Sequence, residues 1–228
     1  MGDDELELVQ AIREQLRDLA EPSRAPAMQA YMKSAMPFLG VRVPVVRSAV
    51  HAVAREHPPA DFDELVAAAT VLWREAAVRE ERYAATALTG LPLALGRLEL
   101  LPLHEEMIVT GAWWDHCDEV AHRVGRTLQA HPEQVAPLLR AWARDRDRWL
   151  RRCAIIGQLG LRERTDVALL TDVVDANLGD HEFFVRKAIG WALRDYGHTD
   201  PRWVRAFVTA RHDALSPLSR REALKHLA

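Results

Sequence analysis

The stretch GAWWDHCDEVAHRVG, from Gly111 to Gly125, places two tryptophans and two aspartates at the start of a predicted helix. Trp114 and Asp118 are four residues apart, so on a helix they share a face. Burying a carboxylate beside an indole is costly unless the charge has a partner. The simpler interpretation makes the tryptophans core residues and lets the acids face water. The alternative is a site, because a carboxylate next to an aromatic face suits a centre of positive charge.

The elements that must position these residues are helices. Apolar residues recur at helical spacing, and strand-like alternation is absent. Prolines fall where helices would begin, as in DPRWVRAF, where Asp200 is the predicted N-cap and Pro201 lies in the first turn. The sequence therefore predicts an all-α protein of short helices. The clearest apolar stripes are Leu8, Ile12, Leu16 and Leu19; Val46, Ala49, Val50 and Val53; and Leu65, Ala68 and Leu72.

The second half of the chain repeats itself at an interval of 35 residues. Aromatic residues at 114, 149 and 184 fall in register, as do Cys117, Arg152 and Lys187. Such a period is typical of a helical-repeat solenoid, in which each helix pair buries its apolar face against its neighbours. We expect the whole chain, residues 1–228, to form one such domain.

Basic pairs recur with the repeat, at Arg151-Arg152, Arg186-Lys187 and Arg220-Arg221. Equivalent places in a solenoid line one surface, and each pair lies near a predicted helix start, where backbone N–H groups also favour anions. A ladder of this kind matches a phosphate backbone. The competing interpretation is an ordinary solvated charged face.

Composition excludes several classes of protein. The 228 residues carry a formal net charge of −3 and a pI of about 6.4, which taken alone argues mildly against a nucleic-acid partner. Two cysteines favour a reducing compartment over a disulfide framework. No apolar run of about 18 residues predicts a membrane span, and the acidic N-terminus does not resemble a signal peptide. We therefore expect a cytoplasmic protein (bacterial cytosol or nucleoid) with no membrane partner.

Metal and cofactor signals are weak. Asp118 and His122 have the i, i+4 spacing that can share a metal, but no second cluster at metal-ligand spacing follows. LHEEM, from Leu103 to Met107, lacks the second histidine of a zinc-protease motif, and the chain has neither a glycine-rich phosphate loop nor a G-x-S-x-G elbow. We expect no metal and no cofactor.

Five blocks in order resemble the AlkD-type DNA alkylation repair proteins, which are HEAT-like-repeat DNA glycosylases. The likeness runs from about residue 25 to the C-terminus. The blocks are YMKSAMPFLGVRVP (31–44), IVTGAWWDHCDEV (108–120), WLRRCAI (149–155), FFVRKAIGWALRDY (183–196) and LSPLSRREALKH (215–226).

The resemblance implies excision of cationic N3- and N7-alkylated purines, such as 3-methyladenine and 7-methylguanine, from duplex DNA. It implies a monofunctional glycosylase that leaves an abasic site and works without a base-binding pocket. By motif, the catalytic residues fall on Asp118, Trp114 and Trp191. The DNA contacts that we expect from this resemblance and from the basic ladder are Arg152, Tyr31, Lys33, Arg42, Arg151, Arg186, Lys187, Arg194 and Arg221.

Departures from the family pattern leave alternatives open. Arg42 and Val43 stand where polar, uncharged residues are expected, and the acidic net charge is unusual. A non-catalytic relative that binds damaged or branched DNA would keep the fold without the activity. A peptide-binding helical-repeat scaffold is the second alternative. The preferred lesion, a simple methyl group or a bulkier adduct, is not determined by these residues, and a monomer is the simplest oligomeric state for a DNA-wrapping solenoid.

Overall fold

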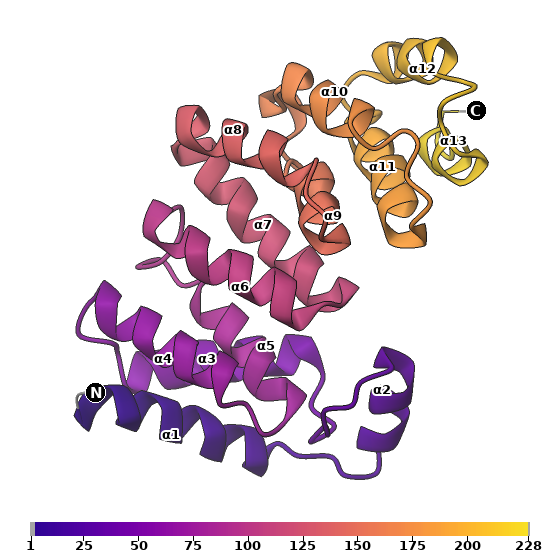
Figure 1. Cartoon of the computed structure of the whole chain (residues 1–228). Coiled ribbons are helices and arrows are strands. Elements are labelled where there is room, and N and C mark those ends of the chain that lie inside the picture. Colours follow the sequence, from indigo (N-terminus) through magenta and orange to yellow (C-terminus); the bar gives the residue numbers. More distant parts are fainter. Residues whose placement is uncertain (1–2, 228) are drawn as a thin grey trace. The chain divides into compact units, whose positions relative to one another are not determined.

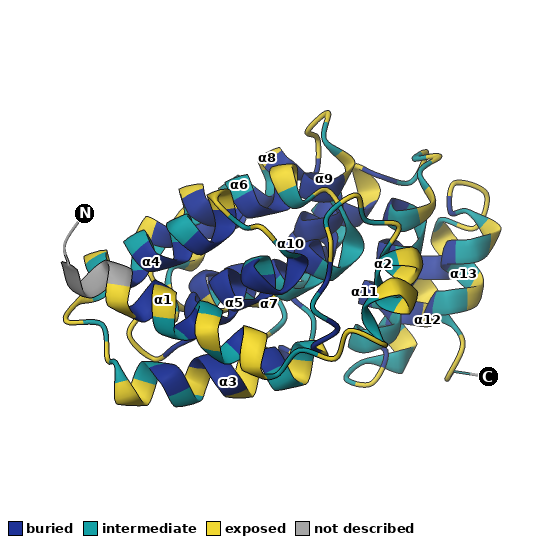
Figure 2. Ribbon diagram, turned by 90° about the horizontal axis from the view of Figure 1, so that it is seen from below, coloured by how far each residue is buried: buried dark blue, intermediate teal, exposed yellow. Residues whose placement is uncertain are grey.

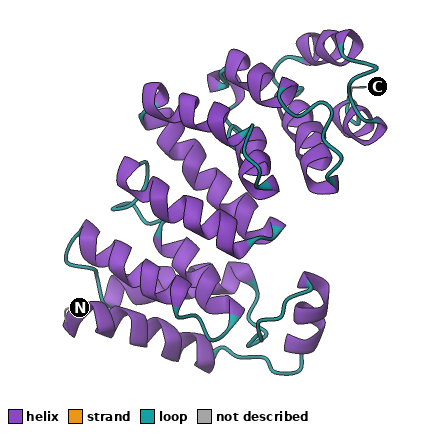
Figure 3. Ribbon diagram, viewed as in Figure 1, coloured by secondary structure: helices purple, strands orange, loops and turns teal. Residues whose placement is uncertain are grey.

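The computed structural model describes residues 3–227, with side chains from Glu7 onward (Figure 1). Within this range the chain forms helices and connecting loops and no strand, which confirms the predicted all-α class (Figure 3). No helix in the described range is long and apolar enough to cross a membrane. The chain divides into two compact units, residues 1–103 and 104–228. The single domain over 1–228 stays a prediction.

The first unit is built around α5, which is buried along its whole length except at Arg82 (Figure 2). Helices α3 and α4 pack directly on α5, and α1 packs on α3 and α4. The apolar stripes predicted for α1, α3 and α4 are buried as expected, apart from Leu19, which is half-buried. The helices of this unit are α1 (Asp3–Asp18), α2 (Ala25–Met32), α3 (Val43–Glu56), α4 (Phe62–Arg74), α5 (Arg79–Leu88) and the short 3-10 helix η1 (Leu98–Leu100).

The second unit shows the predicted repeat. Helices α7, α9, α11 and α13 pack in that order, each on the next, and they begin every 34 or 35 residues. Helices α8, α10 and α12 lie against them as the second helices of the pairs. The remaining bounds are α6 (Leu101–Gly111), α7 (Trp114–Ala130), α8 (Pro132–Trp142), α9 (Arg148–Ile156), η2 (Arg162–Arg164), α10 (Val167–Asp175), α11 (Phe183–Tyr196), α12 (Pro201–Ala210) and α13 (Pro217–Ala223).

Local sequence explains where these helices start. The carboxylates of Asp147, Asp166 and Asp200 accept hydrogen bonds from backbone N–H groups in the first turns of α9, α10 and α12. Each bond satisfies a donor that the helix itself leaves unpaired. Pro201 follows Asp200 in the first turn of α12, so the start predicted for DPRWVRAF is confirmed.

Glycines let the repeated helices approach closely. A Cβ atom on Gly125 of α7 would lie 2.4 Å from the carbonyl oxygen of Gly157, at the end of α9. A Cβ atom on Gly190 of α11 would lie 2.5 Å from the Cβ of Glu222 on α13. Both distances are too short for any side chain, so these positions set the spacing of the helices that carry the candidate site.

Candidate catalytic site

Asp118 and Arg152 form a two-pronged ion pair between α7 and α9. Arg152 Nε donates to Asp118 Oδ1 at 2.7 Å, and Nη2 donates to Oδ2 at 2.8 Å. The Arg152 side chain is 5% exposed and that of Asp118 is 17% exposed. Fork-to-fork geometry fixes both groups in orientation as well as in distance. The pair is possible because the two residues are 34 apart, which brings them to neighbouring helices of the repeat.

Arg152 also ties this pair to α11. Its Nη1 donates to the carbonyl oxygen of Phe184 at 2.7 Å, and its guanidinium carbon lies 5.9 Å from the ring centroids of both Phe184 and Trp191. These bonds use three of the five N–H groups of a guanidinium. Asp118, Arg152 and Trp191 therefore come together from three successive repeated helices. The role of each residue stays a prediction.

The electrostatics of Asp118 are set mainly by its burial. Burial raises the pKa of Asp118 above the ordinary aspartate value, while the hydrogen bonds and charge of Arg152 act in the opposite direction. A carboxylate can accept about four hydrogen bonds, so the two bonds from Arg152 leave acceptor capacity on both oxygens. The exposed part of Asp118 is where a water molecule or a substrate could approach.

The two adjacent tryptophans differ in surroundings. Trp113 is half-buried and packs against Trp149 and Phe184, with ring centroids 6.0 and 5.4 Å away. Trp114 is the first residue of α7, lies half-buried one turn before Asp118 and shares its face of the helix. Trp73 and Trp142 are buried, and Trp203 packs against Tyr196 and Phe207.

Two thiols lie next to the ion pair, at Cys117 and Cys153. Both are completely buried and unoxidised, and Cys117 donates to the carbonyl oxygen of Trp149 at 3.3 Å. Burial raises the pKa of both thiols far above the ordinary cysteine value. Because the nucleophilic form of cysteine is the thiolate, neither residue is suited to nucleophilic catalysis. Among the described residues, no three His, Cys, Asp or Glu side chains form a group that could hold a metal ion.

Several predicted DNA contacts of this unit are engaged by acids or carbonyls of the protein. Arg151 donates to Asp180 at 2.9 Å and to two backbone carbonyls. Lys187 and Arg194 both pair with Glu222 on α13, at 3.0 and 2.6 Å. Arg186 is half-buried, and its buried Nε has no hydrogen-bond partner within the described part of the chain, whereas Arg221 is exposed.

The first unit carries the other three predicted contacts. Tyr31 is 72% exposed near the end of α2, and Lys33 caps that helix with left-handed backbone (φ 50°). Arg42 is exposed at the N-cap of α3. The three residues thus flank one connector, which runs from Lys33 to Arg42.

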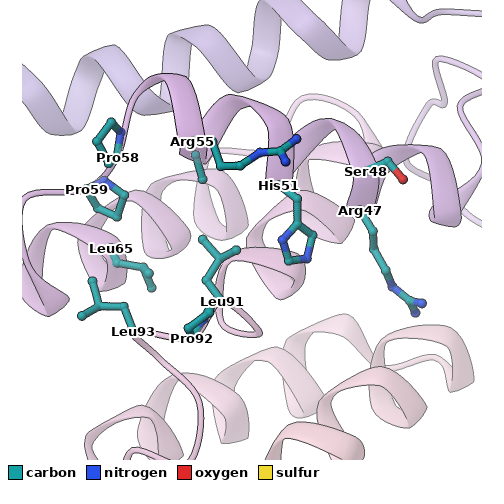
Figure 4. Close-up of a pocket in the computed structure, with 11 residues that line it drawn as sticks. Arg47, Ser48, His51, Arg55, Pro58, Pro59, Leu65, Leu91, Pro92 and Leu93 are labelled. Carbon is teal, nitrogen blue, oxygen red and sulfur yellow. The ribbon is translucent and has the colours of Figure 1, made fainter.

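Sequence reasoning missed a groove in the first unit, with a volume of about 730 Å³ (Figure 4). Arg47, His51 and Arg55 project from one stripe of α3, with Leu91, Pro92 and Leu93 on the facing segment. The four-residue spacing of these basic side chains was the available signal. The remaining lining residues are Ser48, Ala54, Pro58, Pro59 and Leu65, so none of the described residues in its walls carries a carboxylate.

Known protein families and solved structures include matches to most of this chain. The family model described as DNA alkylation repair enzyme matches residues 12–227. The chain is similar to a solved structure described as a predicted DNA alkylation repair enzyme from Enterococcus faecalis, with 30% sequence identity and a TM-score of 0.81. That match covers 92% of this chain and 97% of the other. No curated protein matches the sequence. On these matches, the chain belongs to the DNA alkylation repair enzyme family, and its role is in DNA repair.

Proposed function

We propose that the protein is a monofunctional DNA glycosylase that excises purines carrying a positive charge from N3- or N7-alkylation, such as 3-methyladenine and 7-methylguanine. Duplex DNA is its partner, and the product is an abasic site. The observation that carries the proposal is the buried, two-pronged Asp118–Arg152 pair beside Trp191. The pair also joins three helices, so what separates a glycosylase from a helical scaffold is the full set of Asp118, Arg152, Trp114 and Trp191, which a scaffold does not require.

The chemistry requires little from the protein beyond electrostatics. An alkylated purine already carries positive charge, so it leaves as a neutral base with the electrons of the N-glycosidic bond and needs no acid. Positive charge then grows on the deoxyribose, where a carboxylate stabilises it. Water adds its oxygen to the sugar carbon, and its proton passes to the solvent or to the carboxylate.

In this scheme Asp118 stabilises the sugar and orients the water, and the faces of Trp114 and Trp191 contact the deoxyribose. Arg152 holds the carboxylate in place. Its side chain is 5% exposed, so a backbone phosphate would have to reach its remaining N–H groups through that small opening. The sugar, and not the base, is the group recognised, so the scheme needs no pocket for the base. It is compatible with bulky adducts as well as with methyl groups.

Release of free bases tests the proposal. DNA treated with a simple methylating agent is incubated with the protein, and liberated 7-methylguanine and 3-methyladenine are separated by chromatography. Asp118→Asn is expected to lower single-turnover release about 10²–10³-fold, which is the usual cost of losing one electrostatic group. Unchanged release by this variant would refute the role of Asp118. Salt-dependent DNA binding by the wild type with no release of base would assign the chain to the non-catalytic relatives.

A further inference from the structure

Helix α2 depends on its flanks for its position. None of its residues is buried, although the helix carries the exposed Tyr31. One side of the helix, at Ala25, Met28, Gln29 and Met32, is half-buried. A helix of eight residues with so little covered surface has low stability of its own in water. The segments at its ends, above all the connector from Lys33 to Arg42, therefore supply much of what holds α2.

Glu80, at the start of α5, is the centre of that attachment. Its side chain belongs to a completely buried residue and accepts three backbone hydrogen bonds from the connector. Leu39 N donates to Oε2 at 3.0 Å, and Gly40 N and Val41 N donate to Oε1 at 2.9 and 3.1 Å. A carboxylate that accepts three N–H groups from consecutive residues fixes their backbone far more closely than apolar packing does.

Neighbouring residues complete the attachment on α5. Arg79 N donates to the carbonyl oxygen of Pro37 at 2.9 Å, and Arg79 Nη1 donates to Ser34 Oγ at 3.3 Å. The ring of Phe38 packs edge-on against that of Tyr83, with centroids 6.4 Å apart. Successive residues of the connector are thus bound to the first turns of α5.

The other side of the connector is closed by the segment before α2. Glu21 N donates to the carbonyl oxygen of Leu39 at 2.9 Å. Gly40 has a φ of +89°, and a Cβ atom there would lie 2.1 Å from the carbonyl oxygen of Glu21. Leu39 to Val41 are therefore held between Glu80 and Glu21, with no room to shift.

From this geometry we infer that Glu80 is a positioning residue for DNA binding, which presents Tyr31 and Arg42 by fixing the connector between α2 and α3. The inference rests on the DNA binding of the proposed function, and it does not require base release. It also gives the first sequence block, YMKSAMPFLGVRVP, a physical role: its central FLGV is the part that α5 holds.

Glu81 supplies a matched control on the same helix. It is also buried, but its carboxylate pairs with Arg13 of α1 at 3.1 Å, away from the connector.

Glu80→Gln places an amide N–H against a connector N–H, so we expect faster hydrogen exchange at residues 39–41. We also expect DNA affinity about tenfold weaker, which is the loss typical of one well-placed contact. Glu81→Gln is expected to leave both within about twofold of the wild type, as for a site with no shared partners.

A double-mutant cycle separates positioning from general loss of structure. Tyr31→Ala should weaken DNA binding in the wild type and have almost no further effect in Glu80→Gln, because the ring is no longer held in place. Equal effects of Tyr31→Ala in both backgrounds, or wild-type affinity of folded Glu80→Gln, would overturn the inference. If Glu80→Gln does not fold, Ser34→Ala removes the bond of the same connector to Arg79 with Glu80 intact, and it replaces Glu80→Gln in the cycle. A wild type that binds DNA but frees no base refutes the glycosylase and leaves this result standing.

Discussion

Among the charged contacts between repeated helices of the second unit, one pair and one group of three residues differ in what surrounds them. Asp118 and Arg152 join α7 to α9, where the arginine side chain is 5% exposed. Glu222 joins α13 to α11 through Lys187 and Arg194, whose side chains are 40% and 22% exposed. Arg152, Lys187 and Glu222 occupy equivalent repeat positions, so one position of the repeat carries either sign of charge.

The two carboxylates also differ in the direction of their pKa shifts. Burial raises the pKa of Asp118 despite its arginine, whereas the hydrogen bond from Lys187 is the main cause that lowers the pKa of Glu222. The first pair thus holds an acid under electrostatic cost, which is typical of functional sites. The second is a favourable contact: the Glu222 side chain is 12% exposed, close to the 17% of Asp118, but its cations are more exposed than Arg152. The same repeat supplies a candidate catalytic group at one end and a stabilising contact at the other.

Removing a cation from each site should give the largest difference between the two sites, measured as the loss in the free energy of unfolding. Arg152→Met leaves a largely buried carboxylate without its partner, and we expect the free energy of unfolding to fall by about 3–5 kcal/mol. Lys187→Met should cost less than about 1 kcal/mol, because the lysine side chain is 40% exposed and Arg194 still contacts Glu222. Urea denaturation of both variants measures the difference. Equal losses would mean that burial does not distinguish the pairs.

His104 is a second side chain in this unit whose pKa is shifted mainly by burial, as that of Asp118 is. His104 is 1% exposed, and neither ring nitrogen has a hydrogen-bond partner among the described residues. Burial, with a smaller contribution from the charge of Arg123, lowers the pKa of His104 to about 3 from an ordinary value of 6.5. The unfolded chain therefore binds a proton that the folded chain excludes, so this residue makes stability fall as the pH drops below 6.5.

The size of this effect follows from the pH interval. Between pH 7 and pH 5 His104 should cost the wild type about 2 kcal/mol, at about 1.36 kcal/mol for each pH unit below the unfolded value. His104→Leu should remove that loss in denaturation measured at the two pH values. His51→Gln, on the exposed face of α3, is the control and should leave it in place. A loss that persists in His104→Leu would contradict the assignment.

The sequence predicted the helices that carry this site better than it predicted which side chains contact one another. The helices and the repeat follow from apolar period and register, which are local properties repeated along the chain. The grouping of Asp118, Arg152 and Trp191 was expected from the family resemblance alone. Pairing is not local: whether Lys187 faces DNA or Glu222 depends on the offset between two packed helices. Glu80 gave no signal at all, because its three acceptor bonds exist only once the connector has folded against α5.

DNA binding tests whether Glu222 competes with phosphate for Lys187 and Arg194. Glu222→Gln removes a negative charge and releases Lys187 and Arg194, so we expect DNA affinity at low salt to rise about three- to tenfold with a steeper salt dependence. Arg221→Gln, at the neighbouring exposed position, should weaken binding and reduce the salt slope by about one. Fluorescence anisotropy across a salt series measures both. A Glu222→Gln variant that binds no better would place Lys187 and Arg194 off the DNA surface.

The smallest expected effect is on the pH dependence of stability, to which Asp118 and Glu222 should contribute with opposite signs. Because the folded pKa of Asp118 lies above the ordinary 3.8, its ionisation opposes folding, and this cost disappears as the pH falls through the folded value. Because the folded pKa of Glu222 lies below the ordinary 4.5, its stabilisation is present above that value and is lost as the pH falls. On acidification from pH 7, the stability of the wild type minus that of Asp118→Asn should therefore grow, while the stability of the wild type minus that of Glu222→Gln should shrink. If urea denaturation shows both stability differences changing in the same direction with pH, Arg152 outweighs burial at Asp118. The two sites would then differ only in exposure.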